Sequence, residues 1–104
     1  MAEKNRTSIT EGIPAAMPAL SLAAKLQRKA LVVGMKLPGP GDEAVRVVST
    51  AGRLADPDTD PDTDIDIGEL LFSLVNLARA MGVDPESALR TKAAAFRATV
   101  DARG

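Results

Sequence analysis

The segment from Asp66 to Met81 constrains the fold most, because nearly all of its side chains are apolar. On a helix that turns about 100° per residue, its polar residues fall within roughly a quarter of the circumference. They form a polar seam of Asp66, Glu69, Ser73 and Asn76. The pattern predicts a largely buried helix. Carboxylates three residues apart can face one metal ion, but a seam of this kind can also simply face water, and both interpretations stay open.

Composition favours a single helical domain. The chain has 104 residues, which suits one domain, and its two Phe with no Trp or Tyr leave the core to aliphatic side chains. Those side chains suit helices better than a β-sandwich. We therefore expect an all-α fold.

Several classes of function and location are disfavoured. The chain lacks Cys and His, which removes disulfides, thiolate chemistry, Cys-based zinc sites and the commonest general base. A net charge of −1 gives no electrostatic case for nucleic acid or an anionic membrane as partner. No secretory h-region and no apolar run of about 18 residues is present, so we expect a cytoplasmic protein.

The spacing of apolar residues, together with residues that typically start or stop helices, predicts four helices, over residues 18–33, 42–55, 65–81 and 85–103. Their ends are marked by N-caps at Asp42 and Asp84 and by glycines at 34 and 82. Residues 1–13 are expected to form a mobile tail, and residues 14–104 one domain with an Asp/Pro-rich loop at 56–64. Four helices of moderate length joined by short loops are typical of a four-helix, bundle-like fold. Because helix 65–81 is apolar around most of its surface, we expect a homodimer or tetramer.

Three segments together resemble the MazG-type nucleoside triphosphate pyrophosphohydrolases. They are residues 18–34, with Ala24-Lys25-Leu26-Gln27-Arg28-Lys29-Ala30, residues 68–79, beginning Gly68-Glu69-Leu70-Leu71-Phe72, and residues 82–90, beginning Gly82-Val83-Asp84-Pro85. That family is all-α and converts nucleoside triphosphates to monophosphates and pyrophosphate with magnesium. The resemblance implies a MazG-type fold, a nucleoside triphosphate as possible substrate and Mg²⁺ as cofactor.

The family's site residues carry over incompletely. Its second acidic motif is matched by Asp66 and Glu69, with the two residue types exchanged, and these are the candidate metal ligands. Its first acidic motif aligns with Ser49, Thr50 and Arg53. No catalytic residue is assigned, and Arg53 is expected to replace the metal by neutralising Asp66 or Glu69.

The candidate substrate-binding residues are Asn76, Lys92 and Arg97, whereas Ala93, Ala95, Ala98 and Thr99 stand where the family has other polar contacts. The resemblance thus implies nucleotide pyrophosphohydrolase activity that is weak or lost in a degenerate member.

Three alternatives remain. In the first, activity is retained because a second subunit or the Asp-rich loop supplies further metal ligands. In the second, the chain is a non-catalytic, oligomerising helical partner. The third is calcium binding, because Asp58, Asp60, Asp62, Asp64, Asp66 and Glu69 match the ligand spacing of an EF-hand loop. However, Thr63 stands where that loop needs Gly. A cluster of Lys25, Arg28 and Lys29 could contact phosphate, but an exposed helix face is the favoured interpretation.

Overall fold

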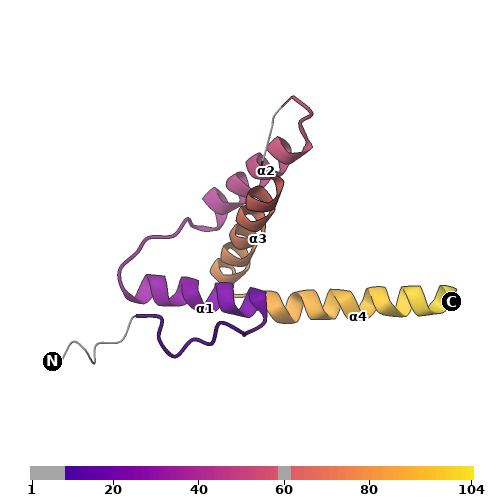
Figure 1. Ribbon diagram of the computed structural model, residues 1–104, viewed down its shortest axis with the longest axis horizontal. Helices are drawn as coiled ribbons and strands as arrows, with labels where there is room; N and C mark the ends of the chain where they lie inside the picture. The colour runs from indigo at the N-terminus through magenta and orange to yellow at the C-terminus, as the bar shows by residue number, and fades with distance from the viewer. Residues whose placement is uncertain (1–8, 59–61) are drawn as a thin grey trace.

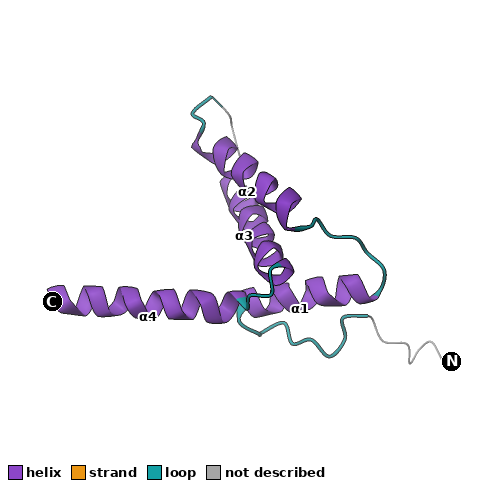
Figure 2. Cartoon of the chain, turned by 180° about the vertical axis from the view of Figure 1, so that it is seen from behind, coloured by secondary structure: helices purple, strands orange, loops and turns teal. Residues whose placement is uncertain are grey.

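The computed structural model describes residues 9–58 and 62–104, which form four helices and no β-strand (Figures 1 and 2). The helices are α1 (Ala19–Val32), α2 (Pro40–Ala55), α3 (Thr63–Ala80) and α4 (Pro85–Arg103). The predicted all-α, four-helix, bundle-like fold is confirmed. No helix in the described ranges is long and apolar enough to cross a membrane.

The helices form an open arrangement in two parts. α2 and α3 pack as an antiparallel hairpin with the most extensive contact of any helix pair, and α1 lies across the base of this hairpin (Figure 1). α4 contacts α1 and α3 near its beginning and then projects away from both (Figure 2). Every residue of α4 from Ser87 onward is consequently exposed.

Local signals set most helix ends. α1 and α3 are each followed, directly after the C-cap residue, by a glycine with positive φ, Gly34 (+90°) and Gly82 (+76°). After α3, the Val83 amide donates to the Ala78 carbonyl at 2.8 Å, which closes a Schellman motif. At the start of α4, Asp84 Oδ1 accepts from the Glu86 amide at 3.0 Å. These three ends agree with the sequence prediction.

The predicted start of α2 is wrong by two residues. α2 begins at Pro40 after Gly39, so that Asp42 lies in the first turn and is not the N-cap. Proline is well tolerated there because its missing N–H has no helical partner in the first turn. Asp42 and Glu43 instead place negative charge near the positive end of the helix dipole.

The buried residues are mostly polar. Only Ala24 and Val75 are buried hydrophobic residues among those described, whereas the buried polar ones are Gln27, Glu43, Thr50, Ser73 and Asn76. The expectation that α3 is largely buried is therefore wrong for a single chain. Leu71 is 49% exposed and Leu74 is 42% exposed. The reason is that α1 and α2 cover one face of α3, and that face carries the polar seam.

The first described residues lie beside α1. The Ile13 amide donates to the Thr10 carbonyl at 3.1 Å in a turn, and Glu11 and Ile13 line a pocket together with residues of α1. Residues 1–8 of the predicted tail and residues 59–61 of the predicted loop lie outside the described residues.

Candidate functional site

The polar seam of α3 is buried against neighbouring segments in its middle. Ser73 and Asn76 are both buried, and Asn76 is only 3% exposed. Asn76 Nδ2 donates to the Pro38 carbonyl at 3.0 Å, and Gln27 Nε2 donates to the Phe72 carbonyl at 3.1 Å. These bonds attach α1 and the segment before α2 to α3. The interpretation that the whole seam faces water is therefore wrong.

Arg53 and Asp66 form an ion pair at the N-terminal end of the seam. Arg53 Nη2 lies 3.6 Å from Asp66 Oδ1, which joins the last turn of α2 to the first turn of α3. The predicted contact between Arg53 and Asp66 is thus confirmed. The Arg53 side chain is 53% exposed and that of Asp66 is 18% exposed. Water therefore reaches the cation far more than the carboxylate.

The other residues of the candidate metal site differ in exposure. Glu69 is exposed on α3, Ser49 is exposed on α2, and Thr50 is buried. Among the described residues no group of three or more acidic side chains could hold a metal ion. Mg²⁺ requires near-octahedral oxygen ligands at about 2.0–2.1 Å. Glu69 is exposed and Asp66 is already paired with Arg53, so these two carboxylates alone supply few of the six ligands.

Glu43 is a buried carboxylate that was not assigned a role from the sequence. It is 2% exposed, and within the described part of the chain its Oε1 has no hydrogen-bond partner. Arg46 Nε lies 4.0 Å from that oxygen, which is an ion pair too long for a hydrogen bond. Its burial could have been inferred from its spacing to Thr50. The two residues are seven positions apart, so they lie on the same face of α2, and both are buried.

The three candidate substrate-binding residues are not brought together. The amide group of Asn76 is engaged at both ends, since its Oδ1 accepts from Arg79 Nη2 at 2.5 Å. Lys92 and Arg97 are exposed on α4, and Lys92 borders an apolar cleft between α1, α3 and α4. Substrate binding by these residues stays a prediction.

The calcium alternative receives no support from the helix boundaries. Asp62 is the N-cap of α3, with its side chain accepting from the Ile65 amide at 3.4 Å. Asp64 and Asp66 lie in the first turn of the helix, whereas an EF-hand loop needs the backbone carbonyl at the Asp64 position as a ligand. Asp60, another ligand position, lies outside the described residues.

The comparison with known proteins yields two relatives, and no family model matches the chain. The nucleoside triphosphate pyrophosphohydrolase/pyrophosphatase MazG of Thermotoga maritima is 36% identical over 87 residues, which cover 84% of this chain and 34% of that protein. The uncharacterized 26.1 kDa protein in the blaB 3′ region of Streptomyces cacaoi is 38% identical over 97 residues, covering 93% and 31%. The chain therefore spans about a third of the length of these curated relatives, and its similarity to the first supports a MazG-like family.

Proposed function

We propose that this chain is a degenerate MazG-like domain whose nucleoside triphosphate pyrophosphohydrolase activity is weak or lost. The similarity to the Thermotoga MazG supports the family assignment. The observation that carries the proposal is the 3.6 Å ion pair between Arg53 and Asp66. It lies where the family resemblance would place acidic metal ligands, and Arg53 supplies there the positive charge that a metal would otherwise supply.

The charge balance of this site supports the proposal that the activity is weak or lost. Hydrolysis of a triphosphate with Mg²⁺ needs enough carboxylates to hold the metal and enough cations to compensate the phosphates. Ser49 and Thr50 contribute no charge, and Arg53 cancels one of the two remaining acids.

Pyrophosphate release tests the proposal directly. The purified chain is incubated with a panel of nucleoside triphosphates and either Mg²⁺ or Mn²⁺, and we expect no release above the protein-free rate. Robust release that disappears in Asp66→Asn would overturn the proposal. Asp101→Asn is the matched control, because it removes an equal charge from an exposed position near the end of α4.

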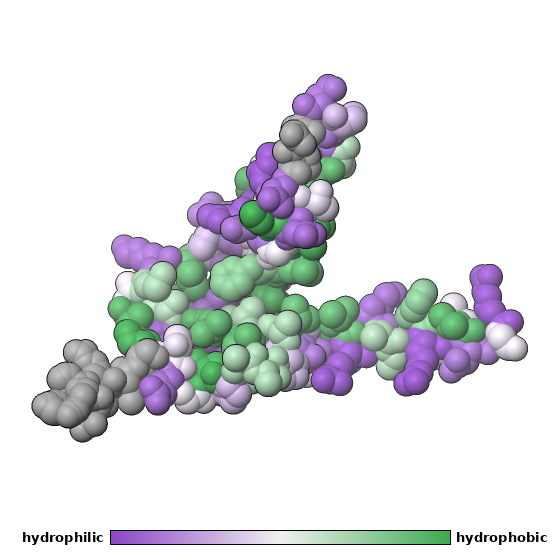
Figure 3. Space-filling view, viewed as in Figure 1, coloured by the Kyte–Doolittle hydropathy of each residue, from purple (hydrophilic) through white to green (hydrophobic). Residues whose placement is uncertain are grey.

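A second candidate function, a non-catalytic oligomerising helical partner, follows from the exposed apolar residues. Exposed large hydrophobic residues of α3 include Ile67, Leu71, Phe72 and Leu74, and those of α4 are Leu89, Phe96 and Val100. Figure 3 shows hydrophobic residues gathered where the α2–α3 hairpin meets the line of α1 and α4. An apolar cleft of about 360 Å³ lies between α1, α3 and α4, bordered by Leu20, Leu74 and Leu89.

We propose that a second copy of the chain covers this surface. The accessible surface of the chain is 7510 Å². A compact monomer of 10.8 kDa exposes only about 5,500 Å² by the usual size scaling, so the excess is about 2,000 Å². Stable homodimers bury an area of this order, roughly 1,000–2,500 Å² per subunit. Light scattering should give at least twice the mass of 10.8 kDa, and a stable monomer at micromolar concentration would contradict the proposal.

A further inference from the structure

The first turns of α1 and α4 meet, and Figure 1 shows the two helices extending in opposite directions from this point. The first turn of a helix has backbone N–H groups without helical partners, and it carries the positive end of the helix dipole. Two positive helix ends therefore lie close together here. They repel each other unless a negative group lies between them.

Glu86 of α4 supplies this negative group. Its Oε1 accepts from the backbone amide of Ser21 at 3.3 Å and from the Ser21 hydroxyl at 3.4 Å, in the first turn of α1. Its Oε2 lies 3.5 Å from Arg90 Nη2, one turn further along α4. The Glu86 side chain is 23% exposed, so water screens these contacts only in part. The carboxylate is thus held between α1 and its own helix.

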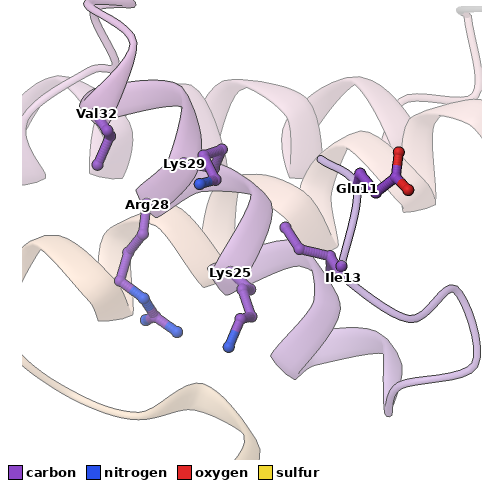
Figure 4. A pocket seen from close by; sticks show the side chains of 7 residues that line it. Glu11, Ile13, Lys25, Arg28, Lys29 and Val32 are labelled. Carbon is purple, nitrogen blue, oxygen red and sulfur yellow. The ribbon is translucent and has the colours of Figure 1, made fainter. Parts of the chain in front are cut away.

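α1 has no residue of its own for this role. Its N-cap is Pro18, which has no side-chain capping bond, and its first turn contains no acidic residue. All charged residues of α1 are cations, namely Lys25, Arg28 and Lys29. Figure 4 shows the side chains of Lys25 and Arg28 extending in the same direction from the helix. The start of α1 is consequently capped from another helix, by Glu86.

The direction of α4 depends strongly on this one side chain. In residues 9–58 and 62–104, Glu86 makes the only hydrogen bonds between α4 and the other helices, and no ion pair joins α4 to them. α4 otherwise meets α1 and α3 at the apolar cleft of about 360 Å³, where packing is incomplete. Every residue of α4 after Glu86 is exposed.

The apolar residues of α4 favour a different direction. Leu89 borders the cleft together with Leu71 and Leu74 of α3. Phe96 and Val100 follow Leu89 by seven and eleven residues, which places all three on one face of α4. Phe96 is 62% exposed and Val100 is 51% exposed. Folding α4 back along α3 would cover these side chains with the exposed apolar residues of α3.

The turn between α3 and α4 is suited to such a movement. It consists of residues 81–84. Connections of about two to five residues commonly join two antiparallel helices, and a few turn residues can absorb the backbone rotation of a hinge. Turning α4 toward α3 moves its first turn away from the start of α1. The contact of Glu86 with Ser21 and the folded-back position of α4 therefore exclude each other.

We propose that Glu86 is a latch that holds α4 in line with α1, and that loss of its contact with Ser21 allows α4 to fold back along α3 of the same chain. The latched arrangement leaves the apolar face of α3 accessible, and the folded-back arrangement covers it. Glu86 is thus a positioning residue for the whole of α4. The inference goes beyond the proposed function, because it concerns one chain and requires neither a nucleotide nor a second copy.

Glu86→Asp tests the proposal. It keeps the negative charge in the first turn of α4 but removes one methylene group, which moves the carboxylate out of reach of Ser21. Spin labels at Asp64→Cys on α3 and Ala98→Cys on α4 report the distance between the helices by pulsed electron paramagnetic resonance, and the chain has no Cys of its own. An excess of unlabelled chain restricts the measurement to distances within one chain.

We expect a single long distance in the otherwise unchanged chain. Glu86→Asp should add a second population that is shorter by at least about 10 Å, because antiparallel helices pack with axes only about 8–10 Å apart. Glu11→Asp is the matched control, since it makes the same chemical change at an exposed position before α1. It should keep the single long distance.

Two results would overturn this inference. One is an identical distance distribution with and without Glu86→Asp while circular dichroism shows unchanged helix content. The other is loss of helix content in Glu86→Asp, because a latch directs α4 without being required for folding. Neither result depends on pyrophosphate release or on the mass in solution, so failure here is distinct from failure of the proposed function.

Discussion

At the scale of the residue, Arg53 determines the charge balance at the N-terminal end of α3. Half of its side chain is exposed, so the ion pair with Asp66 resembles a surface pair and contributes no more than about 1 kcal/mol to the stability of one chain. The alternative of a buried pair, whose loss would cost about 3–5 kcal/mol, does not apply to the isolated chain. The main effect of Arg53 is therefore to neutralise the charge of Asp66, and its contribution to the stability of the fold is small.

Arg53→Glu should convert this position into an acidic site. The substitution places a third carboxylate beside Asp66 and Glu69, so Mg²⁺ should bind the folded state and raise the melting temperature. At a tenfold excess of Mg²⁺ over the dissociation constant, mass action gives about 1.4 kcal/mol of stabilisation. Thermal denaturation with and without Mg²⁺ measures this effect.

Arg97→Glu is the control, because it adds the same charge at an exposed position of α4. We expect no Mg²⁺-dependent change in its melting temperature. If Arg53→Glu melts lower than the wild type and does not respond to Mg²⁺, the transfer of the family's metal site to this part of the chain is wrong.

At the scale of the element, the helix ends depend on glycine conformation more than on packing. A Cβ added at Gly82 would meet no atom within 4 Å, and the same is true at Gly68 inside α3. The two glycines differ in backbone conformation. Gly82 has a φ of +76° in the Schellman motif, whereas Gly68 lies within the helix and has no positive φ.

Alanine at these two positions should therefore have opposite effects. Gly82→Ala should destabilise the protein by about 1–2 kcal/mol, because an L-residue is strained at positive φ. Gly68→Ala should stabilise it by about 0.5–1 kcal/mol, because glycine loses more conformational entropy in a helix interior. Urea denaturation measures both changes. Destabilisation by Gly68→Ala would show that another chain packs closely against α3 at this point.

At the scale of the whole molecule, the shape of the chain is too extended for its length. Its radius of gyration is 17.3 Å and its largest extent is 61 Å, whereas a compact chain of 104 residues has a radius of gyration of about 13 Å. Two of the three buried residues of α3, Ser73 and Asn76, are polar, whereas large apolar residues such as Leu71 and Leu74 are exposed. This inverted distribution is expected for one half of a larger assembly.

Association with a second copy should make the stability depend on protein concentration. Folding coupled to assembly raises the melting temperature as the concentration rises, by mass action. We expect this increase in the wild type and its loss in Leu71→Glu, which places a charge on the exposed apolar face of α3. Glu11→Gln, at an exposed position before α1, is the control. A concentration-independent melting temperature in the wild type would contradict homo-oligomer formation.

The sequence by itself determined the helical class and most helix ends. Gly34, Gly82 and Asp84 act within a few residues of the backbone they stop or cap, so their effect can be predicted without the rest of the fold. The start of α2 was misplaced because Pro40 and Asp42 are both acceptable in a first turn. The predicted contact of Arg53 with Asp66 depended on the family resemblance, which supplied the pairing of α2 with α3.

Only the tertiary structure decided which side of α3 is covered. The apolar and polar residues of α3 are visible in the sequence, but periodicity does not say which neighbour packs against which face. The burial of Glu43 on α2 and the bond from Gln27 on α1 to the Phe72 carbonyl on α3 likewise depend on how these three helices cross. These relations join residues far apart in the chain. They are set by the packing of whole helices, which local sequence patterns do not specify.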